Sequence, residues 1–283
     1  MTPAAVSIIC PYRNGAAFLP GLIADVGAQE HPGWELLLID DGSTDGGADL
    51  AAGAAARDRR IRALTAPPRP PGAPAGPWWP RNHGLAQARH DLIAFLDVDD
   101  RWHPAKLRRQ LDHQRRCGAA LSVTGYARFD SSGSRLLGWR LPPPRFGYGQ
   151  LRATNAIPML TLLIERRLLV EGFQPCPHED YLCWLNMFRR HRDLHCVTIP
   201  ELLAFYGVHP GNLTGARWRM PLWAYDVYRA HGLGRSTSLL SLLPWGLHQV
   251  SSLLRSRRQP LRTTLAAALR AEPPLPLPPA GSS

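Results

Sequence analysis

Residues 93–102, "IAFLDVDDRW", join an apolar run to a cluster of carboxylates. The run is typical of a buried strand, and three of the four residues after it are acidic: Asp97, Asp99 and Asp100. Two carboxylates about 4 Å apart repel each other by about 4 kcal/mol at an effective dielectric near 20. The cluster is therefore either a solvated turn or a site that binds a cation.

Similar apolar runs elsewhere in the first half alternate with helical patterns. The strands predicted in this way lie at residues 6–10, 35–40, 61–65 and 91–97. This order predicts an α/β fold with a mainly parallel sheet that helices cover on both faces. Because ligands of such sheets bind beyond the carboxyl ends of the strands, we expect the chemistry just after Cys10, Ile39 and Leu96.

Polar segments follow three of these strands. They are "PYRN" (11–14), "DDGSTD" (40–45) and "DVDD" (97–100). Each alone is typical of a turn, and Ser43, Thr44 and Asp45 are also good caps for the helix that follows. Together they bring six carboxylates to one edge of the sheet, where Mg²⁺ or Mn²⁺ would bind oxygen ligands and bridge substrate phosphates.

The remaining segments are less regular. Residues 65–80 contain seven prolines and predict an extended loop, in which Trp78 and Trp79 either line a pocket or anchor the chain. The patterns further on predict a hairpin around 131–134, a strand running into a helix within 159–173, a helix at 178–191 and two short strands within 194–210.

The composition indicates a globular protein with an anionic partner. Its 283 residues carry a net charge of +11, which suits a membrane surface, nucleic acid or a phosphorylated substrate. The basic residues are scattered and no nucleic-acid recognition motif occurs, so we expect no nucleic-acid partner. Five cysteines without C-x-x-C spacing, no signal-peptide pattern and no apolar run of about 18 residues predict a cytoplasmic protein without a spanning helix.

Four segments resemble family 2 glycosyltransferases of the GT-A fold: "VSIICPYRNGAAFLPGLIADVGAQ", "WELLLIDDGSTD", "RNHGLAQARHDLIAFLDVDDRWHPAKL" and "HEDYLCWL". The resemblance covers about residues 4–212. It implies transfer of a sugar from a nucleotide-sugar donor with inversion, assisted by a divalent metal and without a covalent intermediate. The acceptor would be a hydroxyl of a glycan, a lipid-linked sugar or a small molecule.

The resemblance also implies a donor site and a metal site at the strand ends. Asp41, assisted by Asp40, matches the carboxylate that accepts a hydrogen bond from the donor base, typically uracil. The donor-binding residues implied are Pro11, Tyr12, Asn14, Asp40, Asp41, Arg81, Asp97 and Asp99, with the Arg81 guanidinium near the diphosphate. The metal ligands implied for Mn²⁺ or Mg²⁺ are Asp100, Asp99 and His209, and Asp99 and Asp100 could exchange roles.

The acceptor side centres on "HED", residues 178–180. Asp180 matches the general base of the family, and the neighbouring Glu179 is expected to raise its pKa. Taken alone, two acidic residues here would favour the start of a helix. We expect His178, Trp102 and Trp184 either to line the acceptor side or to pack in the core.

The character of the chain changes after about residue 215. Residues 210–283 hold nine arginines against two carboxylates, and 238–258 are rich in leucine. We expect a catalytic domain over 1–215, with a donor half to about 103 and an acceptor half over 104–215. A basic, mostly helical extension with a disordered end would follow over 216–283, and its leucine-rich segment would either lie on the inner face of a membrane or pack on the domain.

Two other classes of protein remain open from the sequence. A nucleotidyltransferase on a similar sheet would need a glycine-rich, basic phosphate loop, which "PYRNGAA" lacks. A non-catalytic protein that keeps the fold and binds a membrane surface is compatible with the basic, leucine-rich C-terminal segment.

Overall fold

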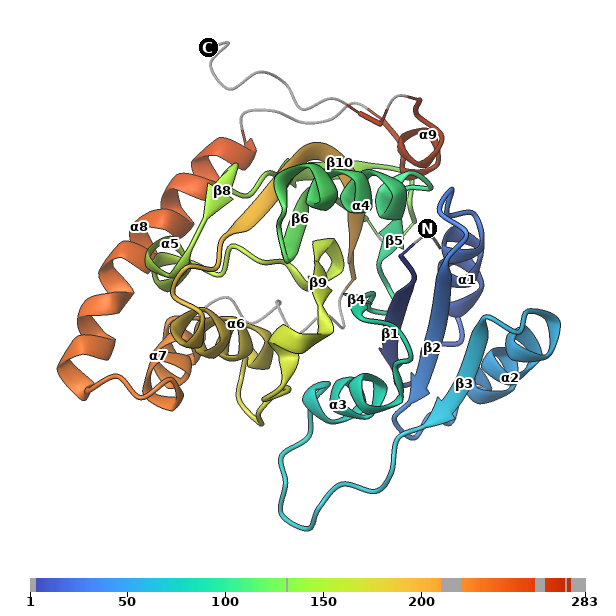
Figure 1. Cartoon of the computed structure of the whole chain (residues 1–283), viewed down its shortest axis with the longest axis horizontal. Coiled ribbons are helices and arrows are strands. Elements are labelled where there is room, and N and C mark those ends of the chain that lie inside the picture. Colours follow the sequence, from blue (N-terminus) through green and yellow to red (C-terminus); the bar gives the residue numbers. More distant parts are fainter. Residues whose placement is uncertain (1–3, 131, 210–219, 258–262, 273, 276–283) are drawn as a thin grey trace.

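A computed structural model describes the chain except for residues 1–3, 131, 210–219, 258–262, 273 and 276–283, and describes residues 248–257 by their backbone alone. Most of the end that we expected to be disordered therefore lies outside the described residues. In the part described, helices cover both faces of a central sheet (Figure 1).

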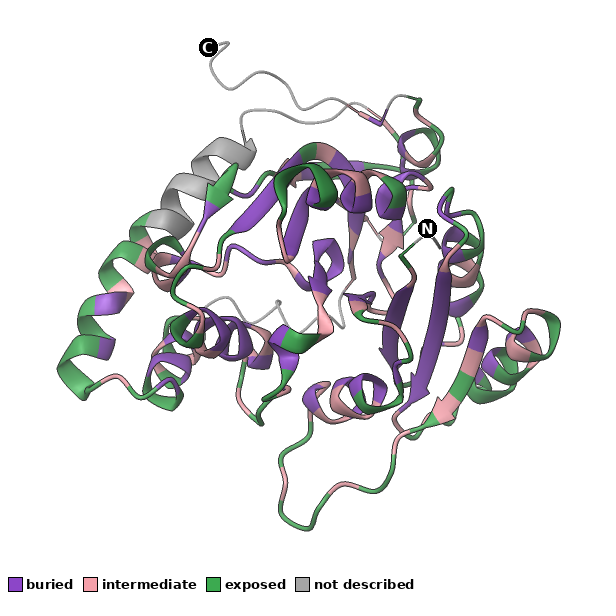
Figure 2. Ribbon diagram, viewed as in Figure 1, coloured by how far each residue is buried: buried purple, intermediate pink, exposed green. Residues whose placement is uncertain are grey.

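The first half of the chain forms the parallel part of the sheet. Its elements are β1 (Val6–Tyr12), α1 (Leu19–Gly27), β2 (Trp34–Asp40), α2 (Gly47–Arg57), β3 (Ile61–Thr65), α3 (Trp78–Gln87) and β4 (Leu92–Phe95). The strands lie in the order β3-β2-β1-β4, and all neighbouring pairs are parallel. β1 and β2 are buried along their whole length, as strands covered on both faces must be (Figure 2). The predicted α/β fold with a mainly parallel sheet is confirmed.

The second half continues the same sheet with mixed directions. Its strands are β5 (Arg101–Trp102), β6 (Leu121–Asp130), β7 (Leu136–Arg140), β8 (Arg145–Phe146), β9 (Leu163–Glu165) and β10 (Cys196–Val208). β9 is antiparallel to β4 and to β6, so it joins the two halves. β6 and β7 form the predicted hairpin. The prediction of two strands within 194–210 is wrong, because β10 is one strand whose irregular register between Ile199 and Ala204 accommodates Pro200.

Helices of the second half pack around this part of the sheet. They are α4 (Lys106–Cys117), α5 (Tyr148–Ala153), α6 (Glu179–Arg190), α7 (Met220–Ala230), α8 (Arg235–Arg257) and α9 (Leu265–Leu269). The helix expected within 159–173 is only the short 3₁₀ turn Arg166–Leu169, after which Gly172 takes a left-handed φ of +61° and redirects the chain.

The C-terminal helices share the apolar core of the preceding residues. Val227 and Tyr228 of α7 are fully buried in the same cluster as α3 and α6, and Leu265 of α9 packs with Phe129 and Leu136. α8 lies at the edge of the molecule, with mostly exposed residues on its outer side (Figure 2). Among the described residues, no helix is both long and apolar enough to cross a membrane.

Residues 66–77 of the proline-rich segment form the predicted extended loop between β3 and α3, but residues 78–80, also expected in the loop, form the first turn of α3 (Figure 1). Trp78 Nε1 donates to the carbonyl of Pro74 at 3.1 Å, and Trp79 Nε1 donates to the carbonyl of Pro67 at 2.6 Å. Of the two roles considered for these tryptophans, these bonds support anchoring of the loop.

Candidate active site

The carboxyl ends of β2, β1 and β4 lie side by side. Tyr12 at the end of β1 pairs with Asp40 at the end of β2, and the Asp41 N–H donates to the Tyr12 carbonyl at 2.8 Å. β4 flanks β1 on its other side, so Asp97 follows a strand end at the same edge. The structure therefore brings the three polar segments together.

Hydrogen bonds hold the loops after β1 and β2 against each other. Asn14, with a left-handed φ of +53°, accepts from the Thr44 N–H at 2.8 Å and donates its own N–H to Ser43 Oγ at 2.9 Å. Asp45 accepts from the Ala16 N–H at 2.8 Å. The expected capping role is wrong for Ser43 and Thr44, because their polar groups bind the neighbouring loop instead.

Asp40 and Asp41 have different environments. Asp40 is buried, and its Oδ1 accepts from the Ser43 N–H at 2.9 Å, so it stabilises the turn. Asp41 forms an ion pair with Arg69 of the proline-rich loop. The pair involves only Oδ2 of Asp41, so Oδ1 can accept a hydrogen bond from a ligand while Arg69 partly neutralises the carboxylate. The sequence did not identify Arg69, since the path of an extended loop has no sequence signal.

Arg81 connects the first half of the chain with α6. It lies in α3, is 5% exposed, and pairs with Asp97 at 2.6 Å and with Glu179 at the start of α6. Burial alone would lower the pKa of Arg81, but these two carboxylates raise it, so the guanidinium stays charged. Its Nε is buried and has no hydrogen-bond partner among the described residues.

The acidic cluster after β4 divides among separate partners. Asp97 pairs with Arg81, and Asp99 Oδ2 lies 2.8 Å from Nε2 of His209, whose ring stacks on Phe18. Asp100 is fully buried, and its Oδ1 accepts from the backbone N–H of Gly207 in β10 at 3.1 Å. Two of the three expected metal ligands, Asp99 and His209, are therefore adjacent, whereas Asp100 binds the sheet.

Burial and mutual repulsion raise pKa values in this cluster. Burial raises the pKa of Asp99, the Asp97 charge raises it further, and the His209 hydrogen bond opposes the shift. Burial likewise raises the pKa of Asp100 well above its usual range, with added repulsion from Asp99 and Asp97. A cation at this edge would relieve the repulsion. Among the described residues, no three His, Cys, Asp or Glu side chains form a complete metal site.

Asp180 and Glu179 begin α6 but face different surroundings. Asp180 is partly exposed, and its carboxylate accepts from Asn155 Nδ2 at 3.2 Å and from the Tyr181 N–H at 2.7 Å. Glu179 is buried against Arg81, and burial raises its pKa to about 7. The sequence did not identify Asn155, because "ATNAIP" resembles an ordinary loop.

The aromatic residues considered for the acceptor side separate into two groups. Trp102 and Trp184 are fully buried, so they pack in the core and cannot line an acceptor site. His178 has a left-handed φ of +56°, and its ring meets the edge of Trp223 from α7 at 5.2 Å between centroids. This partly exposed pair lies beside the start of α6, where Asp180 is found.

This arrangement has the pattern of a known enzyme family. The sequence profile of glycosyl transferase family 2 matches residues 7–164, more than half of the chain. The chain belongs to glycosyl transferase family 2. Members of the family are enzymes, so the protein is a glycosyltransferase that uses a nucleotide-sugar donor.

Curated relatives of this glycosyltransferase align over most of their length. One is TuaG of Bacillus subtilis (strain 168), named as a glycosyltransferase of teichuronic acid biosynthesis; it is 28% identical over 226 residues, which are 79% of this chain and 87% of TuaG. Another is WfgD of Escherichia coli, a UDP-Glc:alpha-D-GlcNAc-diphosphoundecaprenol beta-1,3-glucosyltransferase. WfgD is 31% identical over 223 residues, 78% of this chain and 84% of WfgD.

Solved structures with the same architecture are GT-A glycosyltransferases. Residues 1–349 of TarS from S. aureus, in complex with UDP-GlcNAc, match with a TM-score of 0.64 at 16% identity over 87% of this chain and 73% of that chain. The mannosyltransferase PcManGT from Pyrobaculum calidifontis, in complex with GDP-Man and Mn²⁺, matches with a TM-score of 0.61 at 16% identity over 95% and 79%. This glycosyltransferase therefore has the expected GT-A fold.

The raised pKa of Glu179 predicts how the stability of the glycosyltransferase depends on pH. Between the usual pKa near 4.5 and about 7, the folded protein binds more protons at Glu179 than the unfolded chain does. Its contribution to the free energy of unfolding therefore falls as pH rises through this window. We expect wild type to lose about 1–3 kcal/mol relative to Glu179→Gln between pH 4.5 and 7.5.

Urea denaturation of both proteins at several pH values measures this difference. Comparison with the variant cancels the titration of the other carboxylates. A wild-type curve that runs parallel to that of Glu179→Gln across the whole window would show that burial does not perturb Glu179.

Proposed function

We propose that this glycosyltransferase moves a sugar from a UDP-sugar to the hydroxyl of a lipid-linked acceptor, with inversion at the anomeric carbon. The observation that carries the proposal is the placement of Asp41, the Asp99–His209 pair and the start of α6 with Asp180 around the ends of β2, β1 and β4. These are the positions where a base, a diphosphate and an acceptor would bind in turn.

The loops that follow β1 and β2 support recognition of uracil. Asp41 is fixed by its N–H bond to Tyr12, and Oδ1 of its carboxylate, which Arg69 does not contact, can accept an N–H of the base. Asp40 and Asn14 are occupied in holding this loop, so we assign them a positioning role. The UDP-GlcNAc complex of TarS, which has the same fold, agrees with a uridine donor.

The residues present fit a divalent cation, with Asp99 and His209 as its protein ligands. Mg²⁺ and Mn²⁺ commonly bind through one or two protein ligands together with substrate phosphates, so a pair suffices where a complete protein site is absent among the described residues. A bound Mn²⁺ or Mg²⁺ would neutralise charge on the diphosphate. Asp100, bound to the Gly207 N–H, would hold the Asp99 segment against β10.

Asp180 is proposed as the general base. The acceptor oxygen forms a bond to the anomeric carbon while its proton passes to the Asp180 carboxylate. The bond from that carbon to the diphosphate oxygen breaks, and its electron pair leaves with UDP. Asn155 and the Tyr181 N–H hold the carboxylate in place, and its partial exposure gives an acceptor access to it.

Arg81 is proposed to position both sides of the reaction. Its ion pairs with Asp97 and Glu179 connect the donor half, which ends near residue 103, with the acceptor half over 104–215. The unpartnered Nε supports the predicted contact of Arg81 with the diphosphate, because a buried N–H favours an acceptor.

The acceptor is inferred from a relative. WfgD is named for transfer to a diphosphoundecaprenol-linked GlcNAc, and its alignment covers most of both chains. A lipid-linked hydroxyl would require the enzyme to work at a membrane surface. The His178–Trp223 pair beside the start of α6 supports a sugar acceptor, since aromatic faces pack well on sugar rings.

The Arg69–Asp41 ion pair gives a test of the donor site. In calorimetry with Mn²⁺ present, we expect wild type to bind UDP, and Arg69→Ala to bind it about two- to five-fold more tightly. The reason is that the partly buried Arg69 ion pair draws on the negative charge of Asp41, so its loss strengthens the carboxylate as an acceptor for the base by about 1 kcal/mol or less.

Arg60→Ala is the matched control for this experiment. Arg60 pairs with Asp58 at 2.7 Å, away from the strand ends that hold the site, so UDP affinity should stay at the wild-type value. Absence of UDP binding in wild type would contradict the proposed donor. Weaker binding by Arg69→Ala would instead make Arg69 a donor ligand.

A further inference from the structure

The outer face of α8 carries a row of exposed leucines. Among the large apolar side chains that are exposed in the described part of the chain, four of ten lie on this helix. They are Leu239, Leu240, Leu243 and Leu247, with exposed fractions of 58%, 65%, 66% and 74%. At about 100° per residue they fall within an arc of about 100°, so they form one ridge, which we call the leucine ridge.

The opposite face of α8 packs against the rest of the protein. Ser238 and Ser241 are buried, and Leu242 and Trp245 pack against the main core. A helix that is apolar on all sides is normally buried on all sides. The leucine ridge is therefore the side of α8 that packing within the described protein does not explain.

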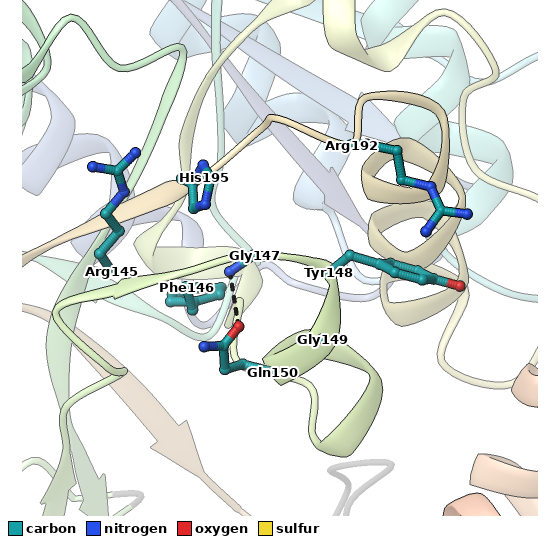
Figure 3. Close-up of a pocket in the computed structure, with 8 residues that line it drawn as sticks. All are labelled: Arg145, Phe146, Gly147, Tyr148, Gly149, Gln150, Arg192 and His195. Carbon is teal, nitrogen blue, oxygen red and sulfur yellow. Dashed lines mark hydrogen bonds between the residues drawn. The ribbon is translucent and has the colours of Figure 1, made fainter.

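A basic basin is lined by α5, the helix that packs against α8 (Figure 3). It has a volume of about 510 Å³, and Arg145, Arg192 and His195 line it together with α5. Arg145 and Arg192 lie at opposite ends, with His195 between them (Figure 3). No carboxylate lines the basin, so its arginine side chains can bind an anion.

α5 lies between the basin and α8. Its residues Tyr148 to Gln150 line the basin, and the same helix packs against α8. Arg152 of α5 reaches Ser241 on the inner face of α8 at 3.5 Å. The basin and the helix that carries the ridge therefore both adjoin α5.

We infer that the leucine ridge and the basic basin together form a contact surface for an anionic phospholipid bilayer. Two interactions hold peripheral proteins on such membranes. Leucine side chains insert below the headgroups, and arginine side chains bind the lipid phosphates. The net charge of +11 adds attraction at longer range. This inference goes beyond the proposed function, because binding to vesicles requires no transfer chemistry.

Sedimentation of the full chain with lipid vesicles tests this surface. Wild type should bind vesicles of phosphatidylcholine with phosphatidylglycerol, and bind pure phosphatidylcholine more weakly. Leu239→Gln/Leu243→Gln/Leu247→Gln, which keeps good helix formers, should lower partitioning to both vesicle types by about ten-fold or more. Arg145→Gln/Arg192→Gln should lower it by about ten-fold on the anionic vesicles alone.

The control replaces exposed apolar residues elsewhere. Val170→Ser/Leu50→Ser should partition like wild type, since Val170 is 73% exposed on a different element and Leu50 lies in α2. UDP binding with Mn²⁺ should be the same in every variant, which separates failure of this surface from failure of the donor site.

Three results would overturn the inference. One is vesicle binding by the leucine variant that equals that of wild type. Another is a wild-type dimer that the leucine variant converts to a monomer, with vesicle binding unchanged, which would make the ridge a contact between copies of the chain. The third is an arginine variant whose binding to neutral and to anionic vesicles falls by the same factor. That result would show that the basin does not bind the phosphate of anionic headgroups.

Discussion

Asp180→Asn is expected to lower the turnover number for sugar transfer by about 10²–10⁴-fold while leaving UDP affinity unchanged. The amide cannot take the acceptor proton, yet it keeps the shape of the carboxylate and can still accept from the Tyr181 N–H. Release of UDP in the presence of acceptor measures turnover, and calorimetry with UDP and Mn²⁺ measures donor binding.

Asp226→Asn is the matched control for this variant. Asp226 is an exposed carboxylate on α7. The charges of both Asp226 and Asp180 raise the pKa of Cys176, so the two carboxylates lie on the same side of the protein. Its neutralisation changes the local charge by the same amount and should leave turnover within about two-fold. Normal turnover by Asp180→Asn would exclude Asp180 as the base. A similar loss of turnover in both variants would show that the loss comes from the change in local charge and not from removal of a base.

The isosteric variants Asp99→Asn and Asp100→Asn are expected to differ strongly in metal-dependent binding. Asp99→Asn should weaken UDP binding in the presence of Mn²⁺ by about 100-fold, since Asp99 and His209 are adjacent and an amide is a poor ligand for this ion. In Asp100→Asn the amide oxygen can still accept from the Gly207 N–H, so affinity should change by about three-fold or less.

Stability gives these two variants a second measurement. Burial raises the pKa of Asp100 well above its usual range, so loss of its charge should increase the free energy of unfolding at neutral pH by about 1–3 kcal/mol. UDP titrations with Mn²⁺ and with a chelator separate the effect of the metal from that of the fold. If Asp100→Asn abolishes binding and Asp99→Asn does not, the ligand role belongs to Asp100.

The sequence was informative wherever function depends on residues close together in the chain. The apolar runs fixed the four parallel strands, and "DDGSTD" and "DVDD" fall at the ends of β2 and β4 as expected. Few strand orders are then possible, because right-handed crossover connections place consecutive β-α-β units side by side in the sheet. The family resemblance in these motifs agrees with the match over residues 7–164.

The predictions that failed involve local irregularity. The two short strands expected within 194–210 are one strand, because a shift of register in β10 accommodates Pro200. Ser43 and Thr44 have good capping chemistry, yet the loop after β1 offers them nearer partners. In both cases tertiary contacts outweighed a local preference, which is worth about 1 kcal/mol for a cap.

Partners across long stretches of chain had no sequence signal. Arg81 meets Glu179 98 residues away, and Asp99 meets His209 110 residues away. Arg69 reaches Asp41 from an extended loop with no regular hydrogen bonds to fix its path. The exposed leucine ridge likewise depends on which face of α8 the core selected.

Periodicity and motif order alone therefore establish the α/β class, the parallel order of the first strands and the residue types available at their ends. The packing of the second half onto the first divides those carboxylates between Arg81, His209 and the Gly207 backbone. The physical reason is that strand and helix periods are properties of consecutive residues. The choice of partner for a buried charge depends on which side chains from distant segments the fold brings within about 3 Å.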